Sequence, residues 1–234
     1  INKQNCEKHI NKFIYTIGIY IYSKQNHDVK TYKYILNSYE SSSGIQLLIP
    51  DPADVKSVYE QTAEASDALI FPFWTRIWPA ALVMSAYLLE EKHWVADKHV
   101  LEVGAGIGLP SFTAAQFAKS VVVSDADTDA VELLNKNIQS MNLSNVSAIQ
   151  ANWNSPIIPS PGVDTLLLSD VCYDPAQYDQ LVRLILSYKK HGTDILITAP
   201  QRTSTASFHA LLSPWIKLAF VRTVNEVEVA LFTV

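Results

Sequence analysis

The chain has 234 residues and a mass of 26.1 kDa, a length that suits one domain or one domain with an added piece. Apolar residues make up 48% and charged residues 18%, which permits a sizeable core and excludes intrinsic disorder. With 18 Lys and Arg against 23 Asp and Glu, the net charge is −5, and this gives no support for a nucleic-acid partner.

Cysteine and hydropathy restrict the class of protein further. Cys6 and Cys172 are too few for a disulfide framework or a Cys-rich zinc site, and the six histidines show no metal-ligand spacing. No apolar run approaches the ~18 residues that span a membrane. We therefore expect a cytoplasmic protein with no bound metal and no membrane partner, and the sequence leaves the oligomeric state open.

The first 65 residues differ in pattern from the rest. Residues 1–44 hold six of the eleven tyrosines, and the segments 13–22 and 31–39 alternate as strands do. A turn and a third strand at 45–49 precede Asp51-Pro52, which predicts a helix to about residue 64. We expect residues 1–65 to form an N-terminal extension of strands and one helix, and residues 66–234 to form the main domain.

The main domain alternates strands with helices. The expected strands are 99–103, 120–124, 147–151, 165–169, 194–199, 216–224 and 226–234, and the expected helices are 79–89, 109–118, 127–141, 175–188 and 204–212. This alternation implies a parallel sheet covered on both faces. The last two strands have no helix between them, so they form an antiparallel hairpin with a tight turn at Asn225.

Three of the seven glycines, Gly104, Gly106 and Gly108, fall within five positions between a strand and a helix. Glycines there let the backbone turn sharply and approach a ligand. The dinucleotide fingerprint needs a glycine at position 109, which is leucine here, and no phosphate-binding Gly-Lys-Ser/Thr is present. The spacing therefore disfavours a pyrophosphate ligand and a dinucleotide oxidoreductase.

A cationic nucleoside without phosphates fits these residues better. Glu102 precedes the loop, where its carboxylate can attract a cation, and Asp125 ends the next strand, where an acidic side chain can accept both ribose hydroxyls. S-adenosylmethionine is an adenosine joined to a sulfonium amino acid and matches both. Trp153, after the third strand, is a candidate to frame the adenine, with a purely structural tryptophan as the alternative.

Three segments resemble a known family: 73–81 (FWTRIWPAA), 100–110 (VLEVGAGIGLP) and 169–173 (SDVCY). Together they are similar to class I S-adenosylmethionine-dependent methyltransferases, and more narrowly to methyltransferase family 16, which contains many protein lysine methyltransferases. The resemblance covers about residues 66–234 and implies a Rossmann-like, seven-stranded, mostly parallel sheet with a C-terminal antiparallel hairpin. Ser169 stands where the family frequently has alanine, and a small residue is kept. Together with Glu102, the expected cofactor-binding residues are Trp78, Gly104, Ala105, Gly106, Asp125, Trp153 and Ser169.

The segment 169–173 matches the family's D-x-x-Y motif through Asp170 and Tyr173. A lysine nucleophile has an ordinary pKa near ~10.4, and burial beside a positive charge would depress it. We expect Asp170 to accept a hydrogen bond from the amine and Tyr173 to close the pocket with its ring face toward a cation. The alternatives are that Asp170 caps the segment that follows it and that Tyr173 is a packed aromatic residue. Arg202 is a weaker candidate that could line a substrate entrance, and the favoured interpretation is a surface arginine in contact with solvent.

These residues predict an S-adenosylmethionine-dependent N-methyltransferase that acts on a lysine side chain of a protein. Two alternatives stay open. One is a small-molecule N-methyltransferase that acts on a nicotinamide-like amine, and the other is a cofactor-binding scaffold without turnover.

Overall fold

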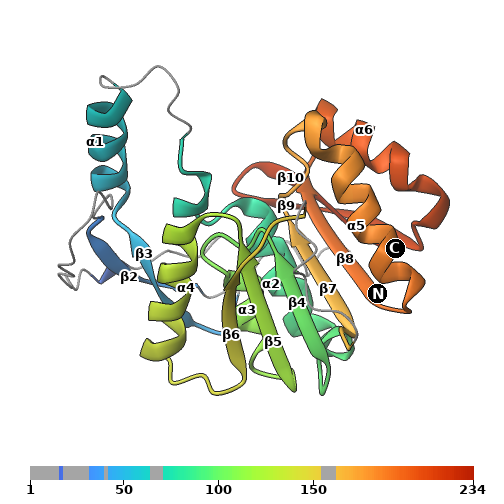
Figure 1. Cartoon of the computed structure of the whole chain (residues 1–234), viewed down its shortest axis with the longest axis horizontal. Coiled ribbons are helices and arrows are strands. Elements are labelled where there is room, and N and C mark those ends of the chain that lie inside the picture. The colour runs from blue at the N-terminus through green and yellow to red at the C-terminus, as the bar shows by residue number, and fades with distance from the viewer. Residues whose placement is uncertain (1–15, 18–31, 40–41, 64–70, 154–161) are drawn as a thin grey trace.

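The computed structural model describes residues 16–17, 32–39, 42–63, 71–153 and 162–234, and it contains two sheets (Figure 1). The larger sheet has seven strands in the order β6-β5-β4-β7-β8-β10-β9. These strands are β4 (His99–Val103), β5 (Ser120–Asp125), β6 (Val146–Gln150), β7 (Thr165–Ser169), β8 (Asp194–Pro200), β9 (Leu218–Val224) and β10 (Val227–Thr233). Every strand expected in the main domain is present within one to two residues.

The direction of the strands follows from their connections. Strands β4 to β8 run parallel, and β10 pairs antiparallel with both β8 and β9. The two residues of the hairpin turn, Asn225 and Glu226, have φ angles of 49° and 64°. Two left-handed residues in a two-residue turn match the right-handed twist of the strands they join. The predicted mostly parallel sheet with a terminal antiparallel hairpin is confirmed.

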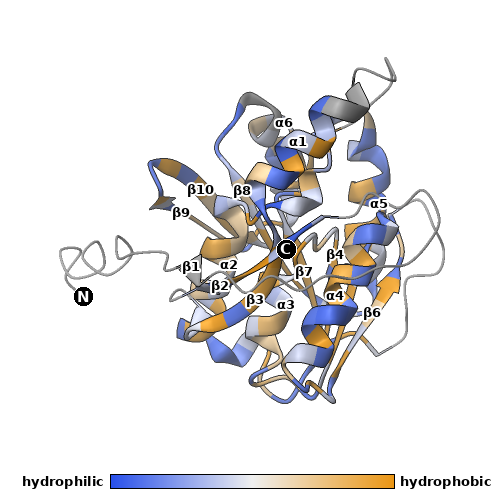
Figure 2. Ribbon diagram, turned by 90° about the vertical axis from the view of Figure 1, so that its left-hand side faces the viewer, coloured by the Kyte–Doolittle hydropathy of each residue, from blue (hydrophilic) through white to orange (hydrophobic). Residues whose placement is uncertain are grey.

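Helices cover both faces of the larger sheet, and the strand residues alternate between them. Val100 packs in one core with helices α2, α3 and α4, whereas Leu101 and Val103 pack in a second core with α5 and α6. Strands that are buried on both faces have nearly continuous runs of apolar residues. The helices α4 and α5, in contrast, carry both hydrophobic and hydrophilic residues (Figure 2). The helices are α1 (Pro52–Ala63), α2 (Pro79–Glu90), α3 (Leu109–Ala114), α4 (Thr128–Ser140), α5 (Tyr178–Lys190) and α6 (Thr203–Leu212), with short 3-10 turns at Phe73–Thr75, Lys92–Trp94, Pro175–Gln177 and Ser213–Trp215.

Local sequence explains how two of these helices begin. Pro79 is the first residue of α2, where its missing N–H is not needed, and Asp127 caps α4 by accepting hydrogen bonds from the N–H groups of Asp129 and Ala130. The helix expected over 109–118 is shorter: α3 ends at Ala114, and the chain then turns into β5.

The N-terminal extension packs on the main domain through a small antiparallel sheet of β1 (Thr16–Ile17), β2 (Tyr34–Tyr39) and β3 (Ile45–Pro50). The rest of the strand expected over 13–22 lies outside the described residues. Strand β3 lies against α4, where the buried side chain of Asn137 accepts a hydrogen bond from the N–H of Leu48 at 2.8 Å and donates one to its carbonyl at 3.0 Å. The extension and α4 therefore share one buried core.

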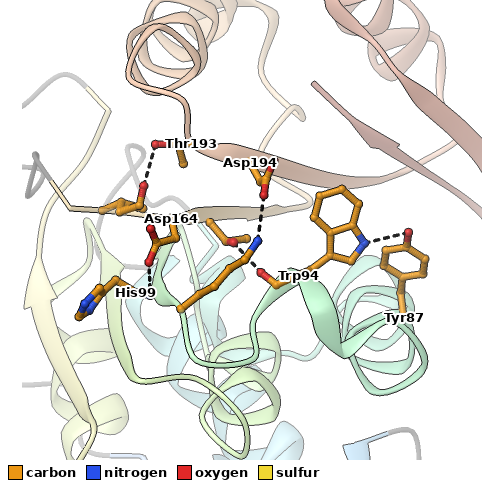
Figure 3. A network of polar contacts seen from close by, with 9 residues as sticks. Tyr87, Trp94, His99, Asp164, Thr193 and Asp194 are labelled. Atoms are coloured by element: carbon orange, nitrogen blue, oxygen red, sulfur yellow. Dashed lines mark hydrogen bonds and ion pairs between the residues drawn. The ribbon is translucent and has the colours of Figure 1, made fainter.

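A polar network closes the edge of the sheet at the amino ends of β4, β7 and β8 (Figure 3). Lys98 Nζ lies 2.9 Å from Asp194 Oδ2, and the backbone N–H of His99 donates to Asp164 Oδ2 at 2.7 Å. Trp94 donates from its indole nitrogen to the hydroxyl of Tyr87 at 3.1 Å. These bonds join the strand starts to each other, and the carboxyl ends of the same strands lie at the opposite edge.

Candidate functional site

A cavity of about 540 Å³ lies over the carboxyl ends of β4, β5 and β7. Ligands of open α/β sheets bind at these ends, and the volume falls within the ~300–1,000 Å³ of small-molecule sites. Of the residues expected in the site, those that line the cavity are Trp78, Gly104, Ala105, Gly106, Asp125, Trp153, Ser169, Asp170 and Tyr173.

The turn after β4 forms one wall of the cavity. Gly104 and Gly106 have φ angles of 71° and 55°, in the left-handed region that favours glycine. A Cβ at Gly104 would lie 3.0 Å from Val171 Cγ1 and 3.3 Å from the ring of Trp153. A Cβ at Gly106 would lie 3.3 Å from the carbonyl oxygen of Trp74. A side chain at either glycine would therefore fill the space beside this backbone, and we call this space the cradle.

Asp125 ends β5 and lies directly beside that turn. Its Oδ2 accepts a hydrogen bond from the N–H of Gly106 at 2.7 Å, and its Oδ1 accepts one from Asp127 at 3.0 Å. Burial raises the pKa of this carboxyl, while the hydrogen bonds oppose the rise. Each carboxylate oxygen has a second lone pair, so Asp125 can still accept hydrogen bonds from the hydroxyl groups of a ligand.

Aromatic side chains form the rim of the cavity. The indole N–H of Trp78 donates to the carbonyl of Phe73 at 2.9 Å, and the ring of Phe73 lies 5.9 Å from that of Tyr173. Phe73 and Tyr173 are each 47% exposed, and phenylalanine is a residue that proteins most often bury. Phe73 opens the segment 73–81 that resembles the family, but its place beside Tyr173 depends on two segments a hundred residues apart and was not predicted.

Asp170 follows β7 directly and adopts a left-handed φ of 54°. Its N–H donates to the carbonyl of Thr198 at 2.8 Å, so the bend is tied to the neighbouring strand β8. The side chain is 8% exposed, and Nη2 of Arg202 lies 3.6 Å from its Oδ2. Burial raises the pKa of the Asp170 carboxyl, and the charge of Arg202 opposes the rise. Arg202 is 44% exposed, yet it faces this carboxylate rather than solvent alone.

Glu102 does not line the cavity. The Oε2 atom of its fully buried carboxyl group accepts hydrogen bonds from the N–H and Oγ of Ser111 on α3, at 2.9 and 2.5 Å. Burial raises its pKa to about 8. The cause is strand alternation: residues 101 and 103 face the α5 and α6 side, so position 102 faces α3. Glu102 is therefore not among the residues that line the cavity, and its expected contact with a cofactor cation stays a prediction.

Tyr32 lines the cavity although it belongs to the N-terminal extension. It is buried, and its ring packs edge-on against Trp74 with centroids 5.7 Å apart. Burial, together with Asp129, Asp127 and Asp54, raises the pKa of its hydroxyl to about 12. A tyrosine in an alternating segment carried no sequence signal for this position.

Metal sites and membrane-spanning helices were also sought among the residues that the structure describes. They contain no cluster of three or more His, Cys, Asp or Glu that could hold a metal ion. None of their helices is both long and apolar enough to cross a bilayer.

The chain matches a family model described as lysine methyltransferase over residues 73–213, more than half of its length. It is 32% identical over 146 residues to the histone-arginine methyltransferase METTL23 of Xenopus laevis, a match that covers 59% of this chain and 62% of that protein. It is 31% identical over 133 residues to the electron transfer flavoprotein beta subunit lysine methyltransferase of Danio rerio, covering 56% of this chain and 51% of that protein.

Solved structures share the fold. An S-adenosylmethionine-dependent methyltransferase from Aquifex aeolicus superposes with a TM-score of 0.51 at 16% identity, covering 78% of this chain and 97% of that one. A tRNA (uracil-54, C5)-methyltransferase from Pyrococcus abyssi, in complex with S-adenosyl-L-homocysteine, gives 0.53 at 15% identity, covering 86% and 44%. The extent of the family match, together with the sheet order, shows that this chain belongs to the lysine methyltransferase family.

Proposed function

We propose that this chain is an S-adenosylmethionine-dependent N-methyltransferase that methylates a lysine side chain of a protein. The observation that carries the proposal is one cavity lined by the glycine turn, by Asp125 and by the Asp170–Tyr173 pair. The family match and the relatives named for lysine methylation support it.

The charges that line the cavity fit this cofactor. The lining residues described include four aspartates and one arginine: Asp125, Asp127, Asp129, Asp170 and Arg76. An acidic wall suits a cationic sulfonium and repels a pyrophosphate. The backbone at Gly104 and Gly106 would lie against the cofactor, Asp125 would accept its ribose hydroxyls, and Trp153 would frame its base. When bound, the cofactor supplies a methyl group already activated on a positively charged sulfur.

The rest of the chemistry is positioning of the amine. A nucleophilic amine must be neutral, and water-excluding walls favour the neutral form. Phe73 and Tyr173 supply apolar ring surface at the rim, and Asp170 supplies a hydrogen-bond acceptor deeper inside. Holding amine and methyl group in line at contact distance can lower the barrier by about 7–11 kcal/mol.

The proposal is tested by methyl transfer from radiolabelled S-adenosylmethionine into the proteins of a cell lysate. We expect label in protein, recovered after hydrolysis as methyl-lysine. The variant Asp170→Asn should lose most of the transfer, whereas Asp179→Asn, an exposed aspartate on α5, should retain it. Binding of cofactor without transfer would favour a scaffold, and label confined to the small-molecule fraction would favour a small-amine substrate.

Arginine is a second candidate for the methylated residue, because the Xenopus laevis relative is named a histone-arginine methyltransferase. The same hydrolysate separates the two cases, since methyl-lysine and methylarginine differ in chromatography. Label recovered as methylarginine would replace lysine with arginine and leave the cofactor assignment intact.

A further inference from the structure

Asp170, which lines the cavity of the proposed amine site, forms an ion pair with Arg202. They follow two neighbouring parallel strands, β7 and β8, whose ends are paired at Ser169 and Thr198. The side chain of Asp170 is almost fully buried, whereas that of Arg202 is 44% exposed. The sheet therefore brings a cation from one strand end to a buried anion at the next.

The other titratable and charged groups near Asp170 do not replace this cation. Cys172 is buried beside it with a pKa raised to about 11, so its thiol is neutral. Tyr173 has a raised pKa because of burial and the charges of Asp125, Asp174 and Asp170, so it is neutral as well. Arg76 lines the same cavity, but the charge that lowers the pKa of Asp170 is that of Arg202.

An unpaired carboxylate would work against methylation. A negative charge beside an amine stabilises the ammonium form and raises the amine pKa. The ammonium ion has no lone pair, so it cannot accept a methyl group. A carboxylate whose charge is offset by a guanidinium still offers lone pairs as a hydrogen-bond acceptor, and its electrostatic hold on a proton is weaker.

We propose that Arg202 is a positioning residue that offsets the charge of Asp170, so that Asp170 orients the substrate amine without holding it as an ammonium ion. The inference rests on the proposed function. In the step concerned, the substrate ammonium loses one proton to water and keeps its nitrogen electron pair. That pair forms the N–CH3 bond as the S–CH3 bond of the cofactor breaks, and the sulfur keeps the bonding pair and leaves in the neutral thioether S-adenosylhomocysteine.

The test compares Arg202→Gln and Arg202→Lys with the wild type and with Arg183→Gln, a control that removes an exposed arginine from α5. The first readout uses the protein alone. The carbon-13 signal of the Asp170 carboxyl is followed against pH, and we expect its pKa to rise in Arg202→Gln but not in Arg202→Lys or in the control.

The second readout is the pH profile of transfer into the lysate fraction that the wild type labels. Opposite charges at this range shift a pKa by about 1–3 units, and partial exposure of Arg202 places the expectation at the low end. We expect the rising limb of kcat to move about one pH unit to higher pH in Arg202→Gln, which is a roughly tenfold loss of kcat below that limb. Apparent KM should stay constant or fall, because the uncompensated carboxylate binds the ammonium form better.

Some results would overturn the inference alone. Examples are a loss of kcat that is equal at every pH, an unchanged titration of Asp170, or a raised KM at constant kcat, which would make Arg202 a substrate contact. A wild-type chain that binds S-adenosylmethionine and transfers no methyl group would refute the proposed function itself, and the inference with it.

Discussion

The side chain of Asn137 offers a direct test of how the N-terminal extension is held on the main domain. Its side-chain amide forms hydrogen bonds with both the N–H and the carbonyl of Leu48, which lie at the edge of β3. Replacing Asn137 with Leu keeps the size of the side chain and removes both partners. Because Asn137 is fully buried and Leu48 is 8% exposed, water does not readily replace the lost bonds.

The expected loss follows from the two orphaned groups. An unpaired buried donor or acceptor costs about 1–3 kcal/mol, so the N–H and the carbonyl of Leu48 together predict a loss of about 2–6 kcal/mol. The total stability of a domain is about 5–15 kcal/mol, so this is a large fraction. Tyr32 precedes β2 and lines the cavity, so the variant should also bind S-adenosylmethionine less tightly.

Urea denaturation of Asn137→Leu against the wild type measures the change, and hydrogen exchange at the Leu48 amide locates it. The matched control is Asn135→Leu on the exposed side of the same helix, where the side-chain amide donates a hydrogen bond to the carbonyl of Val131 one turn earlier. That control should be neutral or slightly stabilising, because leucine is the better helix former. A loss below about 1 kcal/mol for Asn137→Leu would refute the assignment of this pair as a buried clamp.

Three further changes test other parts of the chain. Gly104→Ala should weaken cofactor binding in calorimetry more than Gly192→Ala does, since both have a positive φ but nothing lies within 4 Å of a Cβ at Gly192; equal binding by the two variants would contradict the cradle. Wild-type stability should fall as pH rises from about 4.5 to about 8, because folded Glu102 keeps a proton that the unfolded chain releases. Glu102→Gln should remove that dependence in thermal melts, and identical pH slopes would count against it. Glu90→Gln, which removes the half-exposed partner of a bidentate pair with Arg222, should cost only about 0.2–1 kcal/mol in urea denaturation, and a larger loss would mean that the pair is better shielded than the exposure of Glu90 indicates.

Much of the site lay within reach of sequence patterns because its residues follow strand ends. Gly104, Asp125 and Asp170 each come directly after a predicted strand, and parallel strands bring their carboxyl ends to one edge. This argument does not apply to Glu102, because it lies one position before the last residue of its strand. It lies inside β4, and alternation along the strand, applied strictly, turns it toward α3 and away from the ligand edge.

The contacts that sequence patterns could not predict join distant segments. Phe73 meets Tyr173, Arg202 meets Asp170, and Tyr32 meets Trp74 beside the cavity. Spacing along the chain marks Asp170 and Tyr173 as candidates, but it does not show that Phe73, Arg202 or Tyr32 would lie beside the site. Each is placed by the packing of whole elements, which depends on the twist and order of the sheet.

The sequence by itself determined the alternation of strands and helices, the proline that starts α2, the left-handed turn at Asn225 and the glycine turn after β4, because each depends on the preferences of a few neighbouring residues. The tertiary structure decided which charges meet and which stay apart. It buried Glu102 under α3, paired Asp170 with Arg202 across two strand ends, and placed Tyr32 in the wall of the cavity. The physical reason is that burial and charge pairing are properties of three-dimensional neighbours, and sheet packing brings together residues that the sequence separates by tens of positions.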